Sequence, residues 1–451
     1  MGDPVSDQLL SKLAAARCDG PTIAPDHQDY ERARRVWNGI VDRKPSAILR
    51  AANVDDIRKA VEVAADCGSL LAVRSGGHSF PGLSTCDNGL LLDLSRLNSV
   101  SLNEEAGTVD VGGGALLGDL DRAIVPSGYA VPAGVVSHTG VGGLTLGGGM
   151  GWLGRTQGLT IDKLVGAEIV TASGDLLWTD AARDPELFWG IRGGGGNFGV
   201  VTRFRFKLSR LGSLTAGQWD YPIGQARRAI ASLRSLAERQ PRELSFAFTL
   251  TASDMGVTAI RVGDGGHAGS MLEPFGQLAG PGRGTLGAMS FLHLQSRNDA
   301  HFAWSRRYYA KGGFWHDIDD HAVECMLRQI ADAPTPHSEI YVLQLGGAVA
   351  DVAEDATAYS GRQAAYYWIV EPVWDDPADD ERCIAWCRAA ADQMADRSIQ
   401  ANYVNEQADT AIAPGAYGAG KYERLRHLKM RLDPENLFRL NQNIIPATTS
   451  T

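Results

Sequence analysis

A histidine at the tip of a glycine turn is the first position in this sequence that could do chemistry. The stretch from Leu70 to Phe80 reads Leu-Leu-Ala-Val-Arg-Ser-Gly-Gly-His-Ser-Phe, so an apolar run leads into Arg74, two glycines and His78. Such a run is typical of a short buried strand that ends at a turn. Glycines let the backbone turn sharply and bring its N–H groups close to an anion. The alternative is a tight turn whose histidine is only hydrogen-bonded.

Further glycine-rich segments follow at 112–114, 140–151 and 193–199. The chain holds 53 glycines among 451 residues, and the excess lies between 76 and 199. Several glycine loops at strand ends favour an extended phosphate-bearing ligand, such as a dinucleotide, that threads between them. The Rossmann signature is missing, since no G-x-G-x-x-G follows a first strand with an acidic residue about 20 positions on. No G-x-x-x-x-G-K-[ST] is present either, which argues against a nucleotide-hydrolysing P-loop. Tight turns and close packing remain the alternatives.

Composition and charge indicate a large globular protein. The chain of 451 residues is too long for one ordinary core, and 44% hydrophobic with 21% charged residues is ordinary for a soluble protein. A net charge of −10 with no basic stripe argues against a nucleic-acid partner. No run approaches the roughly 18 apolar residues of a membrane span, and the N-terminus lacks the pattern of a secretory signal. We therefore expect a cytoplasmic protein. The six cysteines have no metal-type spacing, so we expect them to be core thiols and expect no bound metal.

The elements that position these residues change in character along the chain. Up to about residue 211, short strands and glycine segments alternate with short helices; one helix is predicted at 54–67, with Asn53 as its cap. Beyond that point the elements lengthen, and we expect an antiparallel sheet backed by helices at 212–398. Its predicted members include a helix at 224–239 and strands at 286–294, 340–345 and 364–373. The predicted fold class is α+β, and a helix at 419–432 lies in the tail.

The motifs together resemble those of the berberine-bridge-enzyme-like oxidoreductases, which belong to the FAD-linked superfamily of the vanillyl-alcohol oxidase type. The likeness runs nearly end to end and is nearest to the bacterial branch that includes 6-hydroxy-D-nicotine oxidase. The residues that carry it are 74–79, 140–143, 147–149, 155–159, 186–193, 197–200, 403–405, 422–425, 433–438 and 441–444.

The resemblance implies a PCMH-type FAD-binding domain at 1–211, to which the tail at 399–451 returns, and a substrate domain at 212–398. It also implies that a ring nitrogen of His78 is bonded to the C8 methyl group of the flavin, which would raise the flavin's potential and prevent cofactor loss. The implied cofactor-binding residues are Arg74, Ser75, Gly76, Gly77, His78, Ser79, Gly134, Thr139, Gly142, Gly143, Gly147, Gly148, Gly199, Val200, Asn441 and Asn443.

One position departs from the family pattern, and a second bears on the reaction of the flavin with oxygen. Many members hold a second covalent link through a cysteine, where this chain has Val136, so we expect FAD to be attached through His78 alone. Thr139 occupies the position where side-chain bulk controls oxygen access to the flavin. Because threonine is small, this residue favours an oxidase that uses O2; the alternative is that it only packs.

Flavin oxidation of a C–H bond needs a hydride path and usually a base for the leaving proton. By resemblance the first catalytic candidate is Tyr403, since the Tyr-x-Asn run lies near the isoalloxazine ring in the family. A nearby positive charge could lower its pKa and make it a base; a buried, satisfied ring is the alternative. The second is Asp351, with an exposed loop carboxylate as the alternative. Further wall candidates are Gln344 and Glu371, the aromatic residues Tyr341, Tyr366, Tyr367, Trp368 and Trp374, which more often build core, and His138, for which a structural role is favoured.

Three functions remain open from the sequence. The first is an FAD-dependent oxidase of a small organic substrate, such as a secondary metabolite, alkaloid, sugar or alcohol, with O2 as acceptor. The second is a dehydrogenase of the same fold that uses another acceptor. The third is a non-catalytic flavin-binding protein, which the substrate domain and Tyr403 disfavour.

Overall fold

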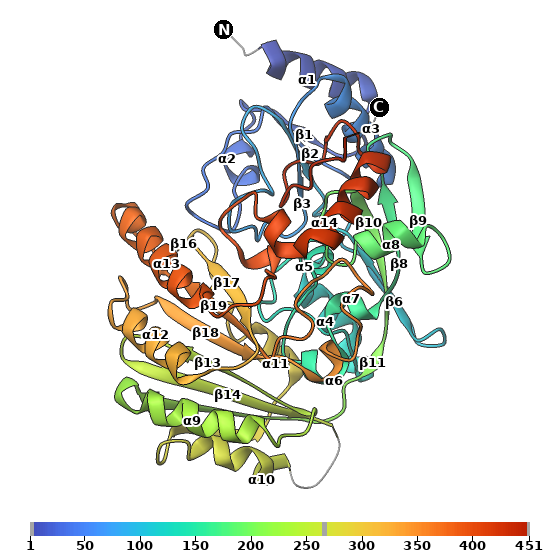
Figure 1. Ribbon diagram of the computed structural model, residues 1–451. Coiled ribbons are helices and arrows are strands. Elements are labelled where there is room, and N and C mark those ends of the chain that lie inside the picture. The colour runs from blue at the N-terminus through green and yellow to red at the C-terminus, as the bar shows by residue number, and fades with distance from the viewer. Residues whose placement is uncertain (1–3, 264–267, 449–451) are drawn as a thin grey trace.

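The computed structural model describes residues 4–263 and 268–448, in which two groups of sheets lie side by side (Figure 1). Helix α1 (Pro4–Ala16) and the last long helix, α14 (Ala413–Leu432), lie in the same part of the molecule. Leu425 and Leu428 of α14 pack into a core that is otherwise built largely from the first 211 residues. The tail of the chain therefore returns to its first half, and the predicted α+β fold is confirmed.

A small, mostly parallel sheet carries the histidine turn. Its order is β1 (Thr22–Ile23), β2 (Ala47–Arg50), β4 (Leu90–Asp93) and β3 (Leu71–Arg74). Strands β2 and β3 both run parallel to β4, which lies between them. The chain therefore has to cross over from the end of β2 to the start of β3, and helix α3 (Val54–Asp66) forms this connection. The Asn53 side chain caps α3 by accepting a hydrogen bond from the Asp56 N–H, as its position predicts. His78 lies just beyond β3, at a strand end.

The second sheet of this half is antiparallel. Its order is β5 (Val100–Asn103), β6 (Thr108–Gly112), β10 (Val200–Lys207), β8 (Leu164–Val170) and β9 (Leu176–Asp180). Strands β8 and β9 pair as a hairpin whose turn has Gly174 in the left-handed region at φ +81°. Helices α4 (Leu117–Ile124) and α8 (Pro185–Gly190) contribute residues to the same core as this sheet.

The glycine segment at 140–151, expected as a loop, contains a helix, α5 (Val141–Gly147). Its start lies against the turn that precedes His78: a side chain on Gly140 would place its Cβ 2.2 Å from the Gly76 nitrogen. Glycine at both positions is therefore needed for the close approach of two backbones. The prediction missed this helix because its glycines serve packing rather than turning.

The second half of the chain forms a seven-stranded sheet. Every neighbouring pair of its strands is antiparallel, as predicted. Its order is β15 (Arg283–Ala288), β12 (Leu214–Pro222), β14 (Asp254–Val262), β13 (Leu244–Leu250), β18 (Glu339–Gln344), β19 (Tyr366–Glu371) and β17 (Lys311–Trp315).

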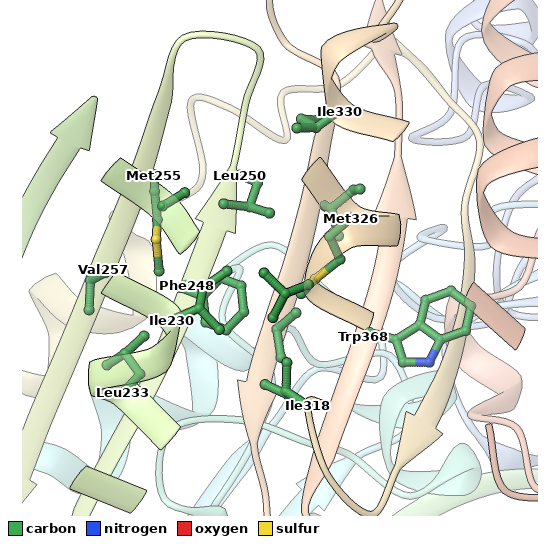
Figure 2. Packing of buried hydrophobic residues seen from close by; sticks show 14 of the residues in the cluster. Ile230, Leu233, Phe248, Leu250, Met255, Val257, Ile318, Met326, Ile330 and Trp368 are labelled. Atoms are coloured by element: carbon green, nitrogen blue, oxygen red, sulfur yellow. The ribbon is translucent and has the colours of Figure 1, made fainter. Parts of the chain in front are cut away.

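Helices α9 (Ala226–Ala237), α12 (Asp320–Ala331) and α13 (Asp380–Ala395) cover the outer face of this sheet (Figure 1). Figure 2 shows the resulting core, in which Ile230 and Leu233 of α9 and Met326 of α12 lie over side chains of β13 and β14. Since this face is filled with apolar side chains, only the opposite face of the sheet is free to contribute to a site.

The predicted strand at 286–294 is wrong in its second half. Strand β15 ends at Ala288, and helix α11 (Phe291–Ser296) follows. The Ser290 hydroxyl accepts a hydrogen bond from the His293 N–H, so a serine cap starts a helix where the apolar residues alone favoured a strand.

The remaining elements are short. They are α2 (Tyr30–Ala33), α6 (Gly154–Gln157), α7 (Thr160–Lys163), α10 (Ala268–Leu272), β7 (Tyr129–Ala130), β11 (Ser209–Arg210), β16 (Arg307–Tyr308), β20 (Val373–Trp374) and the 3₁₀ turns Val125–Ser127, Ile223–Gln225, Glu273–Gly276, Gly347–Val349, Pro377–Asp379 and Val404–Glu406. Cys383 and Cys387 are buried on α13, so the predicted core thiols are confirmed there. Over the described ranges, no helix has both the length and the apolar character that a bilayer crossing requires.

Candidate functional site

A cavity of about 570 Å³ lies where the two groups of sheets and the tail meet. On one side it is lined by the histidine turn and by the start of α5. On the other it is lined by the inner face of the seven-stranded sheet, and residues 403–406 of the tail complete it. The cavity is therefore built from parts of the chain that lie more than 300 positions apart, including Ser75, Gly142, Tyr341 and Glu406.

The His78 ring is held from two sides at the wall of this cavity. Its Nε2 lies 2.6 Å from Nδ1 of His138, and its ring stacks on Trp37 with centroids 4.6 Å apart. Trp37 in turn stacks on Tyr308. Burial lowers the pKa of His78 well below its ordinary value, and neighbouring His138 adds to this effect, so the imidazole is neutral near pH 7. A neutral ring that shares one nitrogen with His138 keeps Nδ1 for another partner.

The backbone after β3 offers hydrogen-bond donors to the cavity. Within residues 4–263 and 268–448, the N–H groups of Gly76, Gly77, His78 and Ser79 have no acceptor. The Ser75 hydroxyl is buried at the same wall and has no partner among the described residues. Buried donors without partners are rare in proteins unless a ligand satisfies them. This donor set suits the carbonyl and phosphate oxygens of an extended cofactor.

Side-chain alternation turns two residues of β18 toward the cavity. Ile340 and Val342 pack into the core beneath the helices. Because successive side chains of a strand point to opposite faces, Glu339 and Tyr341 point to the other face, where both line the cavity.

The neighbouring strand β19 repeats the pattern. Trp368 and Val370 pack beneath the helices, whereas Ile369 and Glu371 line the cavity. The register pairs Glu371 directly with Glu339, so two carboxyl groups lie side by side on the inner face.

Burial holds the carboxyl groups of the cavity in their protonated forms more strongly than usual. It raises the pKa of Glu339 from 4.5 to about 7 and that of Glu406 from 4.5 to about 7. Burial also raises the pKa of Glu371 well above 4.5, and the charges of Glu339 and Glu406 add to this effect. Glu339 and Glu406 can therefore hold or release a proton near neutral pH, and Glu371 favours its protonated form more strongly than an ordinary glutamate.

Arg297 and His301 complete this part of the wall. Arg297 donates from Nη2 to the Thr258 hydroxyl at 3.0 Å and lies over the Trp152 ring. His301 lies 3.6 Å from Glu339, measured from Nε2 to Oε2, and burial lowers the pKa of this histidine to about 4. It is therefore neutral near pH 7 and does not balance the carboxyl groups.

Tyr403 lines the cavity and is almost fully buried. Its hydroxyl oxygen accepts hydrogen bonds from Asn405 Nδ2 at 3.0 Å and from the Met150 N–H at 3.4 Å. The expectation of a lowered pKa is wrong: burial, with the charge of Glu406 next, raises the pKa of Tyr403 above its ordinary value. A tyrosine in this state is a hydrogen-bond donor and positioning group rather than a base.

Asp351, the second catalytic candidate, lies away from the cavity. Its side chain is exposed and pairs with Arg242, with Oδ2 at 2.8 Å from Nη1. The pKa of Asp351 is lowered by this pair. The loop after the glycine turn at 346–347 therefore points this carboxylate to solvent, and we withdraw it as a catalytic candidate.

Most of the predicted cofactor residues lie at the cavity wall, and four do not. Those that line it are Ser75, Gly76, Gly77, His78, Ser79, Gly134, Thr139, Gly142, Gly143, Gly199, Val200 and Asn441. Arg74 instead forms a buried ion pair with Asp93, and Asn443 lies outside the lining. Gly147 makes room for Asn405 of the tail and Gly148 for Tyr359 of the segment 212–398, since a Cβ on either glycine would collide with that side chain.

The wall candidates of the sheet divide by strand position. Glu371 and Tyr341 line the cavity, as does the tail residue Tyr403, against which Tyr367 packs edge to face. The others lie on the helix-covered side or beyond it: Tyr366, Trp368 and Trp374 belong to the outer core, and Gln344 bonds to Gln240.

Sequence reasoning missed Glu339, Glu406, Arg297, His301 and Trp37 as cavity residues. Glu339 had a usable signal, because it directly precedes the strand predicted at 340–345 and lies two positions from Tyr341, which places both on one face once the strand is extended by one residue. Glu406 lies three positions after Tyr403, which was already a candidate for the site, so its closeness in the chain was a signal. The other three come from loops and helix ends, whose place at the cavity depends on tertiary packing.

Comparisons with known proteins bear on the whole chain. A family model described as FAD binding domain matches residues 45–180, and one described as berberine and berberine like matches 402–445. An FAD-linked oxidoreductase of Dictyostelium discoideum is 31% identical over 433 residues, covering 95% of this chain and 95% of that protein. (R)-6-hydroxynicotine oxidase of Paenarthrobacter nicotinovorans is 39% identical over 204 residues, which is 45% of this chain and 44% of that one.

Solved structures agree over almost the full length. Glucooligosaccharide oxidase from Acremonium strictum, described with 6-S-cysteinyl, 8α-N1-histidyl FAD, is 25% identical. Its fold matches with a TM-score of 0.87 over 98% of this chain and 100% of that one.

Proposed function

Because the chain belongs to the berberine-bridge-enzyme-like FAD-linked oxidoreductases, we propose that it is an oxidase of a small organic substrate, which takes a hydride from a C–H bond and passes the electrons to O2. The observation that carries this proposal is the single cavity, which joins the glycine turn of His78 to the polar inner face of the seven-stranded sheet. One side suits a cofactor and the other a substrate.

The residues present fit FAD. The free N–H groups of residues 76–79, the unpartnered Ser75 hydroxyl and the open space beside Gly143 form the cradle. When bound, FAD supplies the hydride acceptor. We propose that 1–211 and 399–451 form the FAD-binding domain and that 212–398 form the substrate domain. The predicted cytoplasmic location stays a prediction.

We propose a single covalent link, through His78. Its Nε2 faces His138, so Nδ1 is the ring nitrogen available for the bond. Val136 lines the cavity, and none of the described cavity-lining residues is a cysteine, which supports one anchor rather than two. The predicted small residue at the oxygen-access position, Thr139, also lines the cavity, which supports O2 as the acceptor.

The leaving proton of the substrate needs a base, and the carboxyl groups suit this role better than Tyr403. Glu371 and Glu406 both line the cavity; burial raises the pKa of Glu406 to about 7, so this carboxyl group can take up a proton near neutral pH, and burial raises the pKa of Glu371 as well. Tyr403 donates its O–H to orient the substrate. Its position is set by Asn405, which also donates to the Leu144 carbonyl.

The function is tested by following the visible absorbance of the flavin in the purified holoenzyme. Anaerobic mixing with a library of amines, alcohols, sugars and phenols is expected to bleach the flavin with at least one class. Fast reoxidation on adding air identifies an oxidase, whereas slow reoxidation with a fast response to an artificial acceptor identifies a dehydrogenase. A flavin that no compound bleaches would contradict an enzymatic function.

A further inference from the structure

The cavity holds more acidic side chains than basic ones. Among its described lining residues are three glutamates, Glu339, Glu371 and Glu406, and one arginine or lysine, Arg297. None of the three glutamates forms an ion pair with an arginine or lysine of the described chain. Buried carboxylates in proteins are normally paired with a cation, and these three have no arginine or lysine partner among the described residues.

Of the three glutamates, Glu371 has a buried carboxyl oxygen without any partner in the described part of the chain. Its side chain is 4% exposed, and its Oε1 has no hydrogen-bond partner within residues 4–263 and 268–448. The strand register places Glu339 directly beside it, so ionising both carboxyl groups sets two like charges against each other, which is destabilising. The fold therefore maintains a costly arrangement that a bound positive group would relieve.

The remaining wall also suits a cation. Tyr341, Tyr403 and Phe302 line the same cavity as the glutamates, and aromatic faces attract ammonium groups. The one fixed cation, Arg297, is engaged by Thr258 and by the Trp152 ring. A neutral hydroxyl compound would leave the paired carboxyl groups without a counter-charge.

We propose that the substrate is an organic amine that is positively charged near neutral pH, and that Glu339, Glu371 and Glu406 hold its ammonium group. This inference rests on the proposed function of the cavity. Oxidation beside the nitrogen is balanced as follows: one N–H proton leaves to a carboxylate, the adjacent C–H bond breaks with its electron pair leaving as hydride to the oxidised FAD, and a C=N bond forms in the iminium product.

The test measures binding to the anaerobic holoenzyme with matched pairs of probes. The pairs are benzylamine with benzyl alcohol, pyrrolidine with tetrahydrofuran, and piperidine with tetrahydropyran. Dissociation constants come from the change in tryptophan or flavin fluorescence, since Trp37 lines the cavity. The amine of at least one pair is expected to bind about tenfold or more tightly than its neutral partner.

Variants assign the preference to the carboxyl groups. Glu339→Gln and Glu371→Gln keep the size of the side chains and remove the charge, so each is expected to bring the two constants of a pair close together. Asp351→Asn removes an exposed carboxylate outside the cavity and is expected to keep the preference. Thermal unfolding of each variant verifies that it is folded.

The outcomes separate this inference from the proposed function. Amines that bind no more tightly than their neutral partners, including no binding by either, overturn the inference; so does a preference that survives both glutamine variants. If sugars or alcohols bleach the flavin and amines neither bind nor bleach it, the oxidase proposal stands and the amine proposal falls. If amines bind selectively but no compound bleaches the flavin, the oxidase proposal falls and the preference of the cavity for ammonium groups stands.

Discussion

At the scale of single residues, the chemistry of this protein depends on how burial changes ordinary side chains. His78 is neutral because it is buried beside His138, and it is oriented by stacking on Trp37. The same effect turns Tyr403 from a candidate base into a donor. Residue type alone would rank tyrosine, aspartate and glutamate together, whereas position separates Asp351 on the surface from Glu371 in the cavity.

Replacing His78 tests the single anchor. Acid-denatured wild-type protein is expected to retain flavin fluorescence on a denaturing gel, and His78→Ala protein is expected to lose all of it, because no second covalent link remains. His427→Ala serves as the control, since that histidine is exposed on α14. Fluorescence that persists in the His78→Ala band would mean that another residue binds the flavin covalently.

At the scale of elements, the period-2 alternation of β18 and β19 decides what the cavity contains. One face of these strands is needed for the core beneath α9, α12 and α13, which assigns the opposite face to the site (Figure 2). The pairing of Glu339 with Glu371 follows from the register of the two strands. Stability is reduced by this pair, and such a cost is common at functional sites.

Glu339→Gln is expected to raise the free energy of unfolding above pH 7 by about 1–3 kcal/mol. The folded state raises the pKa of Glu339 from 4.5 to about 7, so the folded protein binds more protons than the unfolded one between these values. The contribution of Glu339 to stability is therefore present below pH 4.5 and is lost as the pH rises to about 7. The Glu339→Gln variant has no carboxyl group to ionise at this position, so its free energy of unfolding does not fall for this reason.

Urea denaturation at several pH values measures the effect. The wild-type free energy of unfolding should fall more steeply than that of Glu339→Gln between about pH 4.5 and 7. Glu381→Gln, on the exposed side of α13, is the matched control and should follow the wild type. Equal slopes for all three proteins would contradict a buried, unpaired Glu339.

At the scale of the whole molecule, the site exists only because three distant parts of the chain are held together. A buried ion pair joins the loop before β19 to the first half: Arg362, with no exposed side-chain surface, donates from Nη2 to Asp162 Oδ1 at 2.8 Å and to the Thr357 hydroxyl at 2.8 Å. The tail is held through Lys429, which is fully buried, pairs with the buried Asp433 and donates from Nζ to the Asn197 carbonyl at 2.7 Å.

Arg362→Ala is expected to lower the free energy of unfolding by about 3–5 kcal/mol, because it leaves Asp162 buried without its counter-charge. Chemical denaturation of the holoenzyme measures this loss. The exposed pair of Arg242 and Asp351 gives the control: Arg242→Ala should cost about 1 kcal/mol or less. A similar small cost for both variants would show that the Arg362 pair does not hold the junction.

Much of this molecule follows from local pattern. The strand and turn that carry His78, the helix 54–67 with its Asn53 cap, the antiparallel sheet and the helices over it were all predicted from apolar periodicity and turn residues, which act over a few neighbouring positions. Motif likeness added FAD, and the family is confirmed. The α5 helix and the α11 start were missed, because close backbone packing and a serine cap override the pattern.

What the sequence by itself determined is the set of parts: a histidine on a glycine turn, an FAD-linked family and an alternating strand. Only the tertiary structure decided which carboxyl groups share the cavity, since strand register and the return of the tail bring Glu339, Glu371 and Glu406 to one wall. It also decided the protonation of Tyr403 and the exposure of Asp351. Burial and the distances between charges arise from residues far apart in the chain, so no local pattern contains them.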